Sequence, residues 1–445
     1  MPITETSATL ALDLNYVRSQ FPSLSQTING HPAAFLDGPG GTQVPQRVID
    51  AIADYLRRDN ANTGGAYATS RRSDAMIAEA RSAMADFLHC AADEVLFGPN
   101  MTTLTYAMSR AIGRAIKARE PKSGDEILVT RLDHDANVSP WLAMAEDFGL
   151  TVRWAELHDE DCTLDMADLA SKINSNTKVV AVGYASNAVG TINPVKEIVR
   201  LAHAAGALAY IDAVHYGPHG LIDVADIDCD FLVCSTYKFF GPHMGVLFGK
   251  REHLKRLRPY KVRPNTNAIP NCWEWGTLNH ESIAGITACV EYLADLGRHH
   301  GICGDGRPAR LSSEARPGAT TTRRAAIEGA YEVIHEHERA QLKRIMAGLQ
   351  EIPGLKIYGI TDPARFNERC ATLAVRIADQ TPLELAIKLG DRGVFTWDGN
   401  YYALNLTEHL DVEKSGGFLR IGLVHYNTQE EVDRLLAALR EIVGA

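Results

Sequence analysis

Long apolar runs are missing from this sequence of 445 residues. No segment approaches the roughly 18 uninterrupted apolar residues that a membrane-spanning helix needs. The first residues, MPITETSATLALDL, contain none of the basic side chains that begin a signal peptide. We therefore expect a cytoplasmic protein that does not enter a membrane.

An excess of positive charge is missing as well. The chain has 45 Lys and Arg against 55 Asp and Glu, which gives a formal net charge of −10. Proteins that bind nucleic acid neutralise phosphates with basic surfaces. We therefore do not expect nucleic acid as a partner.

Closely spaced cysteine pairs are also absent. The eight cysteines are spread along the chain and include no C-x-x-C pair, which supports neither a disulfide framework nor a structural zinc site. His299, His300 and Cys303 lie close together in sequence, but no fourth ligand follows at regular spacing. We expect no metal site, and we expect most of the cysteines to be small buried apolar side chains.

Short apolar runs alternate with helical runs between residues 43 and 296. This alternation is typical of a parallel sheet covered by helices. Runs such as VVAVGY contain no alternating polar residues, so we expect their strands to be buried on both faces. Helices are expected at residues 44–57, 73–88 and 103–118, and strands at 95–97, 126–130, 178–183, 208–211, 231–234 and 245–248.

The pattern changes in the last third of the chain. Residues 298–322 are rich in Gly, Pro, Ser and Arg without a hydrophobic period, which predicts a loop or linker. A helical run then continues to residue 349, followed by expected strands at 356–358, 372–376 and 419–423 and helices at 382–392 and 429–442. We predict an N-terminal segment (1–30) that packs with the small domain, a large α/β domain (31–297), the linker (298–322) and a small α+β domain (323–445).

Lys238 follows an apolar run directly. The segment FLVCSTYKFFGPHMGVLF (231–248) predicts a strand, a turn and a second strand, so Lys238 lies in a turn enclosed by apolar sequence. Lysine is rarely buried without a partner or a function. One interpretation is a lysine that reaches from the turn into solvent. The other is a nucleophilic amine with a pKa lowered by desolvation, which can form a Schiff base with an aldehyde.

Asp212 ends another apolar run, and His215 follows three residues later. In a sheet of this class, ligands bind outside the carboxyl ends of the strands. Taken alone, Asp212 would be a helix cap or a turn residue. With Lys238 after a nearby strand, its carboxylate would instead keep a pyridinium nitrogen protonated, as the electron sink of pyridoxal phosphate (PLP) requires.

Ordered motifs extend along nearly the whole chain. They are FLDGPGGTQ (35–43), SNAVGTINP (186–194), DAVH (212–215), PH (218–219), DFLVCSTYKFFGP (230–242) and YNTQEEVDR (426–434). Their order and spacing resemble the class V aminotransferase family of PLP enzymes, in particular its cysteine desulfurase and selenocysteine lyase branch. The resemblance implies an α/β fold of PLP fold type I, with a mostly parallel sheet flanked by helices in the large domain.

The resemblance also implies roles around the cofactor ring. Lys238 is similar to the lysine that joins the cofactor aldehyde and moves protons at the substrate α-carbon. Asp212 is similar to the acid that pairs with the pyridine nitrogen, and His134 to the histidine that stacks on the ring. His215 stands where the family usually has Gln, beside the phenolic oxygen. Asn187 resembles the amide near that oxygen and the substrate carboxylate.

Phosphate binding is implied for residues 98–103, which correspond to the family's Gly-Thr-Thr turn at the start of a helix. A helix N-terminus with small hydroxyl side chains suits phosphate. Met101 stands at one expected threonine position, so its backbone amide and Thr102 would make the contact. Ser235 resembles the family's phosphate serine. Tyr237 replaces the histidine that commonly precedes the lysine, which leaves the donor at this position open.

Two further residues are implied to bind from other parts of the molecule. Thr277, in WGTLN, matches a threonine that reaches the cofactor from the neighbouring subunit, which implies a homodimer. Arg420, in GFLRIGL, resembles the arginine that binds the substrate α-carboxylate, a group that suits the guanidinium fork. The substrate is therefore expected to be an amino acid.

The resemblance breaks at the residue that carries sulfur in the desulfurases. That branch has a mobile cysteine in a Gly-x-x-Cys-Ala segment, whose thiolate takes sulfur from the substrate as a persulfide. Here the segment is GNYYA (399–403), with Tyr402 in the cysteine position, and a phenol cannot hold a persulfide. The nearest alternatives, Cys303 and Cys370, are interpreted as structural or incidental thiols, because nothing near them indicates a lowered pKa.

Four aromatic residues surround this segment and allow two interpretations. They form either a substrate wall for something bulkier than cysteine, with Tyr402 as a substrate-binding residue, or an ordinary core hairpin. The four are Phe395, Trp397, Tyr401 and Tyr402.

The most favoured function is that of a PLP-dependent lyase that cleaves the carbon–sulfur bond of cysteine or an S-substituted cysteine. A class V aminotransferase or epimerase acting on another amino acid would use the same early steps and remains an alternative. A third alternative is an inactive homologue that serves as a binding or scaffold protein. The intact Lys238, Asp212 and Arg420 argue against it.

Overall fold

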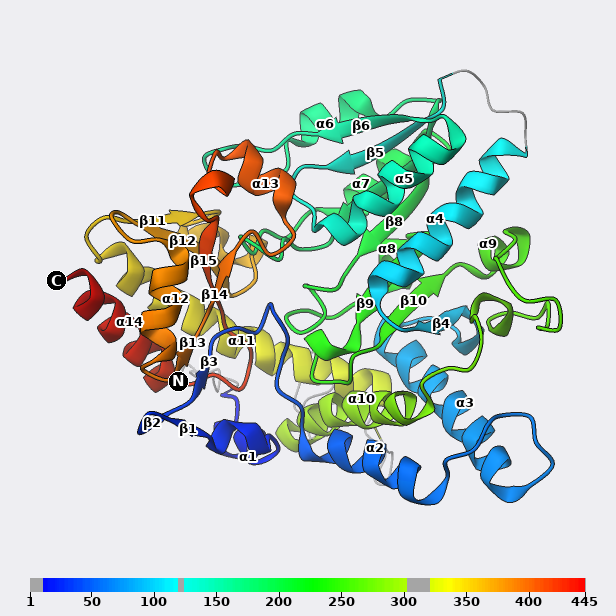
Figure 1. Ribbon diagram of the computed structural model, residues 1–445, viewed down its shortest axis with the longest axis horizontal. Coiled ribbons are helices and arrows are strands. Elements are labelled where there is room, and N and C mark those ends of the chain that lie inside the picture. Colours follow the sequence, from blue (N-terminus) through cyan, green and yellow to red (C-terminus); the bar gives the residue numbers. More distant parts are fainter. Residues whose placement is uncertain (1–10, 119–123, 302–320, 445) are drawn as a thin grey trace, which may run out of the picture.

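The computed structural model describes residues 11–118, 124–301 and 321–444. A seven-stranded sheet lies at the centre of the larger part (Figure 1). Its strands are β4 (Val95–Gly98), β5 (Glu126–Thr130), β6 (Thr151–Ala155), β7 (Thr177–Gly183), β8 (Leu208–Asp212), β9 (Phe231–Ser235) and β10 (Gly245–Gly249). They are arranged in the order β4-β10-β9-β8-β7-β5-β6, and only β10 runs antiparallel to its neighbours among these paired strands.

The expected strands of this sheet are confirmed to within one residue at each end. Strands β5, β9 and β10 are buried along their whole length, as expected for strands covered on both faces. Strand β6 was not expected from the sequence. It lies at the edge of the sheet and alternates exposed and partly buried residues, so it contains no apolar run.

Helices cover both faces of the large sheet. One face, which includes Val179 and Ala181, packs against α4 and α5; the other, which includes Val180 and Val182, packs against α3, α7 and α10. The helices of this part are α2 (Gln46–Arg58), α3 (Ala68–Leu88), α4 (Met101–Lys117), α5 (Ser139–Phe148), α6 (Met166–Lys172), α7 (Val195–Ala204), α8 (Val224–Ile227), α9 (Arg251–Arg256) and α10 (His280–His300). The α/β layering expected from the sequence is therefore confirmed.

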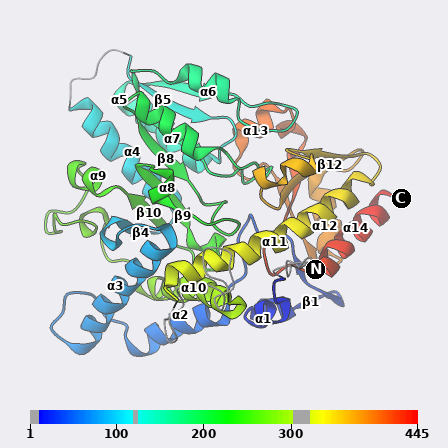
Figure 2. The same cartoon turned by 180° about the vertical axis from the view of Figure 1, so that it is seen from behind.

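A second, antiparallel sheet forms the smaller C-terminal part, with the order β11-β12-β15-β14. Its strands are β11 (Leu355–Tyr358), β12 (Thr372–Ile377), β14 (Trp397–Gly399) and β15 (Phe418–Gly422). The helices are α11 (Arg323–Gln350), α12 (Pro382–Gly390), α13 (Leu404–His409) and α14 (Gln429–Val443). The long α11 contributes its first half to the core of the large part and its second half to the core of the small part (Figure 2).

The segment before α2 crosses between the two parts. It contains α1 (Leu14–Ser19), the short strands β1 (Thr27–Ile28) and β2 (His31–Pro32), and β3 (Ala34–Phe35), which pairs in parallel with β13 (Val394–Phe395). In α1, Arg18 donates to the backbone oxygen of Tyr426 and forms an ion pair with Glu431 at 2.9 Å. None of the helices in the described part of the chain is long and apolar enough to cross a membrane.

The expected loop at residues 298–322 is wrong at its start, because α10 continues to His300. The last turn of α10 is held by contacts that hydrophobic periodicity does not reveal. Arg298 forms an ion pair with Asp295 at 2.7 Å, and the ring of His299 stacks on that of Tyr16. Residues 302–320, including Cys303, lie outside the described residues.

Candidate active site

Three neighbouring strands of the large sheet end side by side. Gly183 at the end of β7 pairs with Asp212 at the end of β8, and Asp212 pairs with Val233 two residues before the end of β9. The chain leaves β9 through one 3₁₀ turn, Thr236–Lys238. The strand ends therefore bring Asp212 and Lys238 to the same edge of the sheet, as the sequence predicted.

The amine of Lys238 points to the segment that follows β3. Its Nζ donates hydrogen bonds to the backbone oxygens of Pro39 and Gly40, the latter at 3.1 Å. Burial, together with the charge of Arg420, lowers the pKa of Lys238 to about 7, against the opposing charges of Asp212 and Asp37. A large fraction of this amine is thus neutral and nucleophilic near neutral pH.

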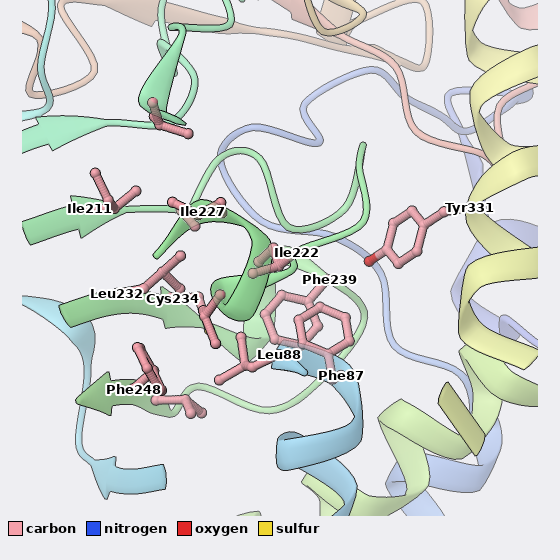
Figure 3. Close-up of a cluster of buried hydrophobic side chains, with 14 of the residues drawn as sticks. Phe87, Leu88, Ile211, Ile222, Ile227, Leu232, Cys234, Phe239, Phe248 and Tyr331 are labelled. Carbon is pink, nitrogen blue, oxygen red and sulfur yellow. The ribbon is translucent and has the colours of Figure 1, made fainter. Parts of the chain in front are cut away.

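The turn that carries Lys238 is fixed on both sides. Thr42 donates its N–H to the backbone oxygen of Tyr237 at 3.1 Å, and its hydroxyl accepts from the N–H of Phe240 at 2.8 Å. Phe240 adopts a φ of 75°, which is costly for a bulky residue and requires such support. Phe239 stacks on Phe87 of α3 within the buried core beside α11 (Figure 3).

Two carboxyl groups lie buried at the strand ends. Asp212 accepts from the N–H of Val214 at 2.9 Å, and burial raises its pKa to about 6 although Lys238 acts in the opposite direction. Asp133 accepts from the N–H of Gly183 and from the hydroxyl of Thr130. Burial, together with the charge of Asp212, raises the pKa of Asp133 well above its usual range.

Asp133 and a third acid, Asp37, were not predicted as site residues. Burial raises the pKa of Asp37 to about 6, and the charges of Arg420 and Lys238 act against this rise. Asp133 follows a strand of the sheet closely, which is a usable signal for a ligand-binding position. Asp37 gave no such signal, because it meets Lys238 only through the packing of distant segments.

Arg420 enters the site from the small part. It lies on β15, is buried, and donates from Nη1 to the backbone oxygen of Asn187 at 3.0 Å. Its guanidinium carbon lies 4.1 Å from the ring centroid of Tyr401. Burial lowers the pKa of Arg420 to about 10, so the side chain remains charged at neutral pH. A buried cation with free donors suits an anionic ligand.

Within the described residues, several buried polar atoms around Lys238 have no hydrogen-bond partner. Buried polar atoms are normally satisfied, so a group of such atoms in one region is typical of a site that binds a polar ligand. They are Oγ of Ser235, Oδ1 of Asn187, Nε2 of His215 and Nε of Arg420.

His134 and Tyr402 face each other. Nδ1 of His134 accepts from the N–H of Ala136 at 3.0 Å, and burial lowers the pKa of His134 to about 3, so the ring is neutral. The ring of Tyr402 stacks on the ring of His134: the two centroids lie 5.4 Å apart and the ring planes make an angle of 28°. Tyr402 remains 71% exposed.

The backbone of the tyrosine pair is held in an unusual conformation. Tyr401 and Tyr402 have φ values of 54° and 62°, which bulky residues rarely adopt. The backbone oxygen of Tyr401 accepts from the side-chain amide of Asn187 at 2.9 Å, and that of Tyr402 from the N–H of Asp135 at 2.7 Å. Three of the four aromatic residues therefore lie against the site, Tyr401 at Arg420, Tyr402 at His134 and Trp397 at Gly40, whereas Phe395 packs on Phe35.

The N-terminus of α4 approaches the end of β9 through β10. Asn100 caps the helix by accepting from the N–H of Thr103. Gly245 pairs with Ser235, and a Cβ on Gly245 would lie 2.4 Å from the carbonyl carbon of Asn100 and 2.7 Å from the nitrogen of Met101. Only glycine allows this approach, which brings Met101 and the adjoining Thr102 near Ser235.

Tyr237 and Thr277 take different positions. Tyr237 lies beside Lys238, whose Nζ is 4.9 Å from its ring centroid, and it stacks on His243. Thr277 is exposed and lines a surface pocket with Thr103 and Trp275, so it does not join the residues around Lys238 in the same chain.

No activated thiol lies among the cysteines that the structure describes. Burial raises the pKa of each of these seven thiols, so the neutral form dominates. Cys370 is buried two residues before the start of β12.

The chain matches the family model of the class-V aminotransferases at residues 34–301 and 323–435. It is 30% identical to a cysteine desulfurase of Pectobacterium carotovorum over 448 residues, which cover 97% of this chain and 98% of that protein. It is also 30% identical to a probable cysteine desulfurase of Halalkalibacterium halodurans, with the same coverage of both chains.

Solved structures share the fold. The apo structure of a cysteine desulfurase from Thermococcus onnurineus matches with a TM-score of 0.81 and 24% identity, over 97% of this chain and 98% of that one. The cysteine desulfurase CsdA from Escherichia coli, in its S-sulfonic acid form, matches with a TM-score of 0.80 and 23% identity, over 98% and 99% of the two chains.

Proposed function

Because the chain belongs to the class V aminotransferase family, we propose that it is a PLP-dependent lyase that cleaves the carbon–sulfur bond of cysteine or an S-substituted cysteine. The observation that carries this proposal is the buried Lys238 amine, with a pKa of about 7, in the electrostatic field of the Asp212 carboxyl group and the Arg420 guanidinium. The names of the curated relatives support cysteine as the substrate class.

The residues of the site fit PLP. The unpartnered hydroxyl of Ser235, the start of α4 and Thr102 would bind the phosphate. The unpartnered Oδ1 of Asn187 and a ring nitrogen of His215 would lie at the phenolic oxygen. Met101 would contribute its backbone amide to the phosphate, and Tyr237 lies in the same turn as the lysine. His134, being neutral, would lie against the ring.

When bound, PLP supplies an aldehyde that joins an amino group and a ring that accepts the electron pair from the α-carbon. Asp212 would hold the proton on the pyridine nitrogen. Arg420 would bind the substrate carboxylate through its free Nε and so orient the α-carbon. The neutral amine of Lys238 would then take the α-proton, which a protonated amine cannot do.

The fate of the sulfur distinguishes this chain from the desulfurases. By its place in the GNYYA motif, Tyr402 would stand in the position of the persulfide cysteine. Of the seven cysteines in the described part of the chain, Cys90 is partly buried and the other six are buried, and all seven have raised pKa values. We therefore propose that sulfur leaves the protein directly: cysteine and water give pyruvate, ammonia and hydrogen sulfide. With an S-substituted cysteine, the corresponding thiol leaves instead.

We also propose a homodimer in which Thr277 binds the phosphate in the neighbouring site. Thr277 is exposed next to the exposed Trp275, near the start of α4. Tryptophan is enriched at protein–protein interfaces relative to the rest of the surface, which supports this proposal.

Product analysis tests the proposed function. The PLP-loaded protein is incubated with cysteine, cysteine sulfinate and S-substituted cysteines, and pyruvate, ammonia, sulfide and alanine are measured. We expect pyruvate and ammonia in equal amounts, abolished by Lys238→Ala and retained by the surface variant Lys255→Ala. Alanine with a persulfide on the protein would contradict the elimination route, and no pyruvate from any sulfur compound would contradict the lyase.

A further inference from the structure

Three potential metal ligands lie together beside the candidate active site. One ligand atom from each of His215, His219 and Cys370 lies within 4.8 Å of the other two, and all three residues are buried. The two histidines follow β8, whereas Cys370 precedes β12 in the small part. The cluster therefore forms where the two parts of the chain meet.

His219 is already oriented as a ligand. Its Nδ1 lies 2.7 Å from Oε2 of Glu338 on α11, and Glu338 is itself buried. This contact favours a proton on Nδ1 and leaves the lone pair on Nε2. A carboxylate on the second nitrogen is the usual partner of a histidine that binds a metal ion.

The remaining ring nitrogens give an independent indication of a ligand. Nε2 of His219 and Nε2 of His215 are both buried and have no hydrogen-bond partner in residues 11–118, 124–301 and 321–444. Leaving such atoms unsatisfied is costly, and each of them can accept a metal ion. The thiol of Cys370 completes a set of two nitrogens and one sulfur.

We infer that His215, His219 and Cys370 bind a divalent cation that favours nitrogen and sulfur ligands, with Zn²⁺ as the best match. Tetrahedral zinc binds sulfur at about 2.3 Å and nitrogen at about 2.0 Å, which separates its ligand atoms by roughly 3.3–3.6 Å. The three ligand atoms lie within 4.8 Å of one another. Side-chain rotations that move them by about 1 Å would bring them to this geometry. Binding forms a zinc–sulfur bond and releases the thiol proton of Cys370 to solvent.

A cleft of about 450 Å³ leads to the cluster and is lined by His219, Cys370, Glu338, Tyr184 and Tyr216. The cleft provides a route for the ion and for a water molecule in the fourth coordination position. An open fourth position is typical of zinc sites that bind small molecules rather than purely structural ones.

This inference does not depend on the proposed function. Only His215 belongs to both sites. With Nε2 of His215 on the metal ion, Nδ1 is the ring nitrogen that remains for the phenolic oxygen. The tests therefore use residues that serve the metal cluster alone.

Zinc binding is measured by equilibrium dialysis of the PLP-loaded protein, followed by elemental analysis. We expect about one tightly held Zn²⁺ per chain, lost in Cys370→Ser and retained in Cys229→Ser, which changes another fully buried cysteine. Glu338→Gln should weaken zinc binding by about 10–100-fold, because it weakens the contact that orients His219. Zinc held equally by wild type and Cys370→Ser, or no tightly held zinc, would overturn the inference.

X-ray absorption at the zinc edge of the wild-type protein provides a second test, which does not depend on whether Cys370→Ser folds. We expect one sulfur and two imidazole nitrogens around the metal. A coordination shell without sulfur would overturn the inference.

Discussion

Lys238 is the residue whose chemical state decides the proposed reaction. Its amine has a pKa of about 7, mainly because it is buried, and secondly because Arg420 lies near. Below this pH the amine is protonated and cannot attack a carbonyl group, whereas above it the amine is neutral. An exposed lysine, with a pKa of about 10.4, is still protonated on both sides of pH 7.

We predict that acetylation of Lys238 in the cofactor-free protein becomes half-maximal at a pH of about 7. The measurement is competitive labelling with acetic anhydride between pH 5 and 10, read by peptide mapping, with surface lysines as internal controls. If Lys238 were labelled only at the pH of the surface lysines, its environment would not be the one described.

Arg420 should determine substrate binding rather than cofactor binding. We predict that Arg420→Lys lowers kcat/KM by about 10–100-fold, because a charge-assisted hydrogen bond contributes about 1.5–3 kcal/mol. Steady-state kinetics with the best substrate provide the measurement, and PLP absorbance serves as the control. Loss of PLP with unchanged kinetics of the loaded fraction would contradict this assignment.

At the scale of residues, the sequence could predict those residues of the candidate site that follow buried strands. Lys238 and Asp212 could be found because each follows an apolar run, and the resemblance added His134 and Arg420. Asp37 could not be found, because its proximity to Lys238 depends on how the segment after β3 packs across two parts of the chain.

At the scale of elements, β10 and α4 form the expected phosphate region together. A Cβ on Gly245 would collide with backbone atoms of Asn100 and Met101, which cannot rotate away. We predict that Gly245→Ala displaces the start of α4 and weakens PLP binding at least about 10-fold, because one hydrogen bond to the charged phosphate would be lost.

Gly390→Ala is the matched control for this prediction, since a Cβ there would meet nothing within 4 Å. Fluorescence titration with PLP provides the measurement for both variants. Equal PLP affinities of Gly245→Ala and Gly390→Ala would show that the start of α4 does not contact the cofactor.

The central strands could be predicted because strands covered on both faces are continuous apolar runs. Strand β6 could not, because its exposed edge removes this signal. The end of α10 was also missed, since Arg298 is held by an ion pair with Asp295 and His299 by a hydrogen bond with Asp13 and stacking on Tyr16, which hydrophobic periodicity does not reveal.

At the scale of the whole molecule, the two domain-like parts meet at the candidate active site. Arg420 and Tyr402 come from the C-terminal part, whereas Lys238, Asp212 and His134 come from the large sheet. The sequence could indicate both parts from their patterns. It could not show which faces meet, because this depends on α11 and the segment before α2, which pack against both.

The proposed dimer predicts that an inactive subunit and an impaired subunit can complete one normal site. Thr277→Ala alone should weaken PLP binding about 10–100-fold, as expected for a lost hydrogen bond to phosphate. Lys238→Ala subunits would supply an intact Thr277 to partners that carry Thr277→Ala. Co-expressed, differently tagged chains should form hybrids with one normal site each, measured as high-affinity PLP binding and activity. If the hybrids bound PLP no more tightly than Thr277→Ala dimers, Thr277 would not contribute to the site across the interface.

The central claim is that Lys238 is the amine that joins PLP. Borohydride reduction of the PLP-loaded protein, followed by proteolysis and mass spectrometry, tests it most directly. We expect the reduced cofactor on Nζ of Lys238 and no modification of this peptide in Lys238→Ala. Reduced cofactor on another lysine, with Lys238 unmodified, would contradict it.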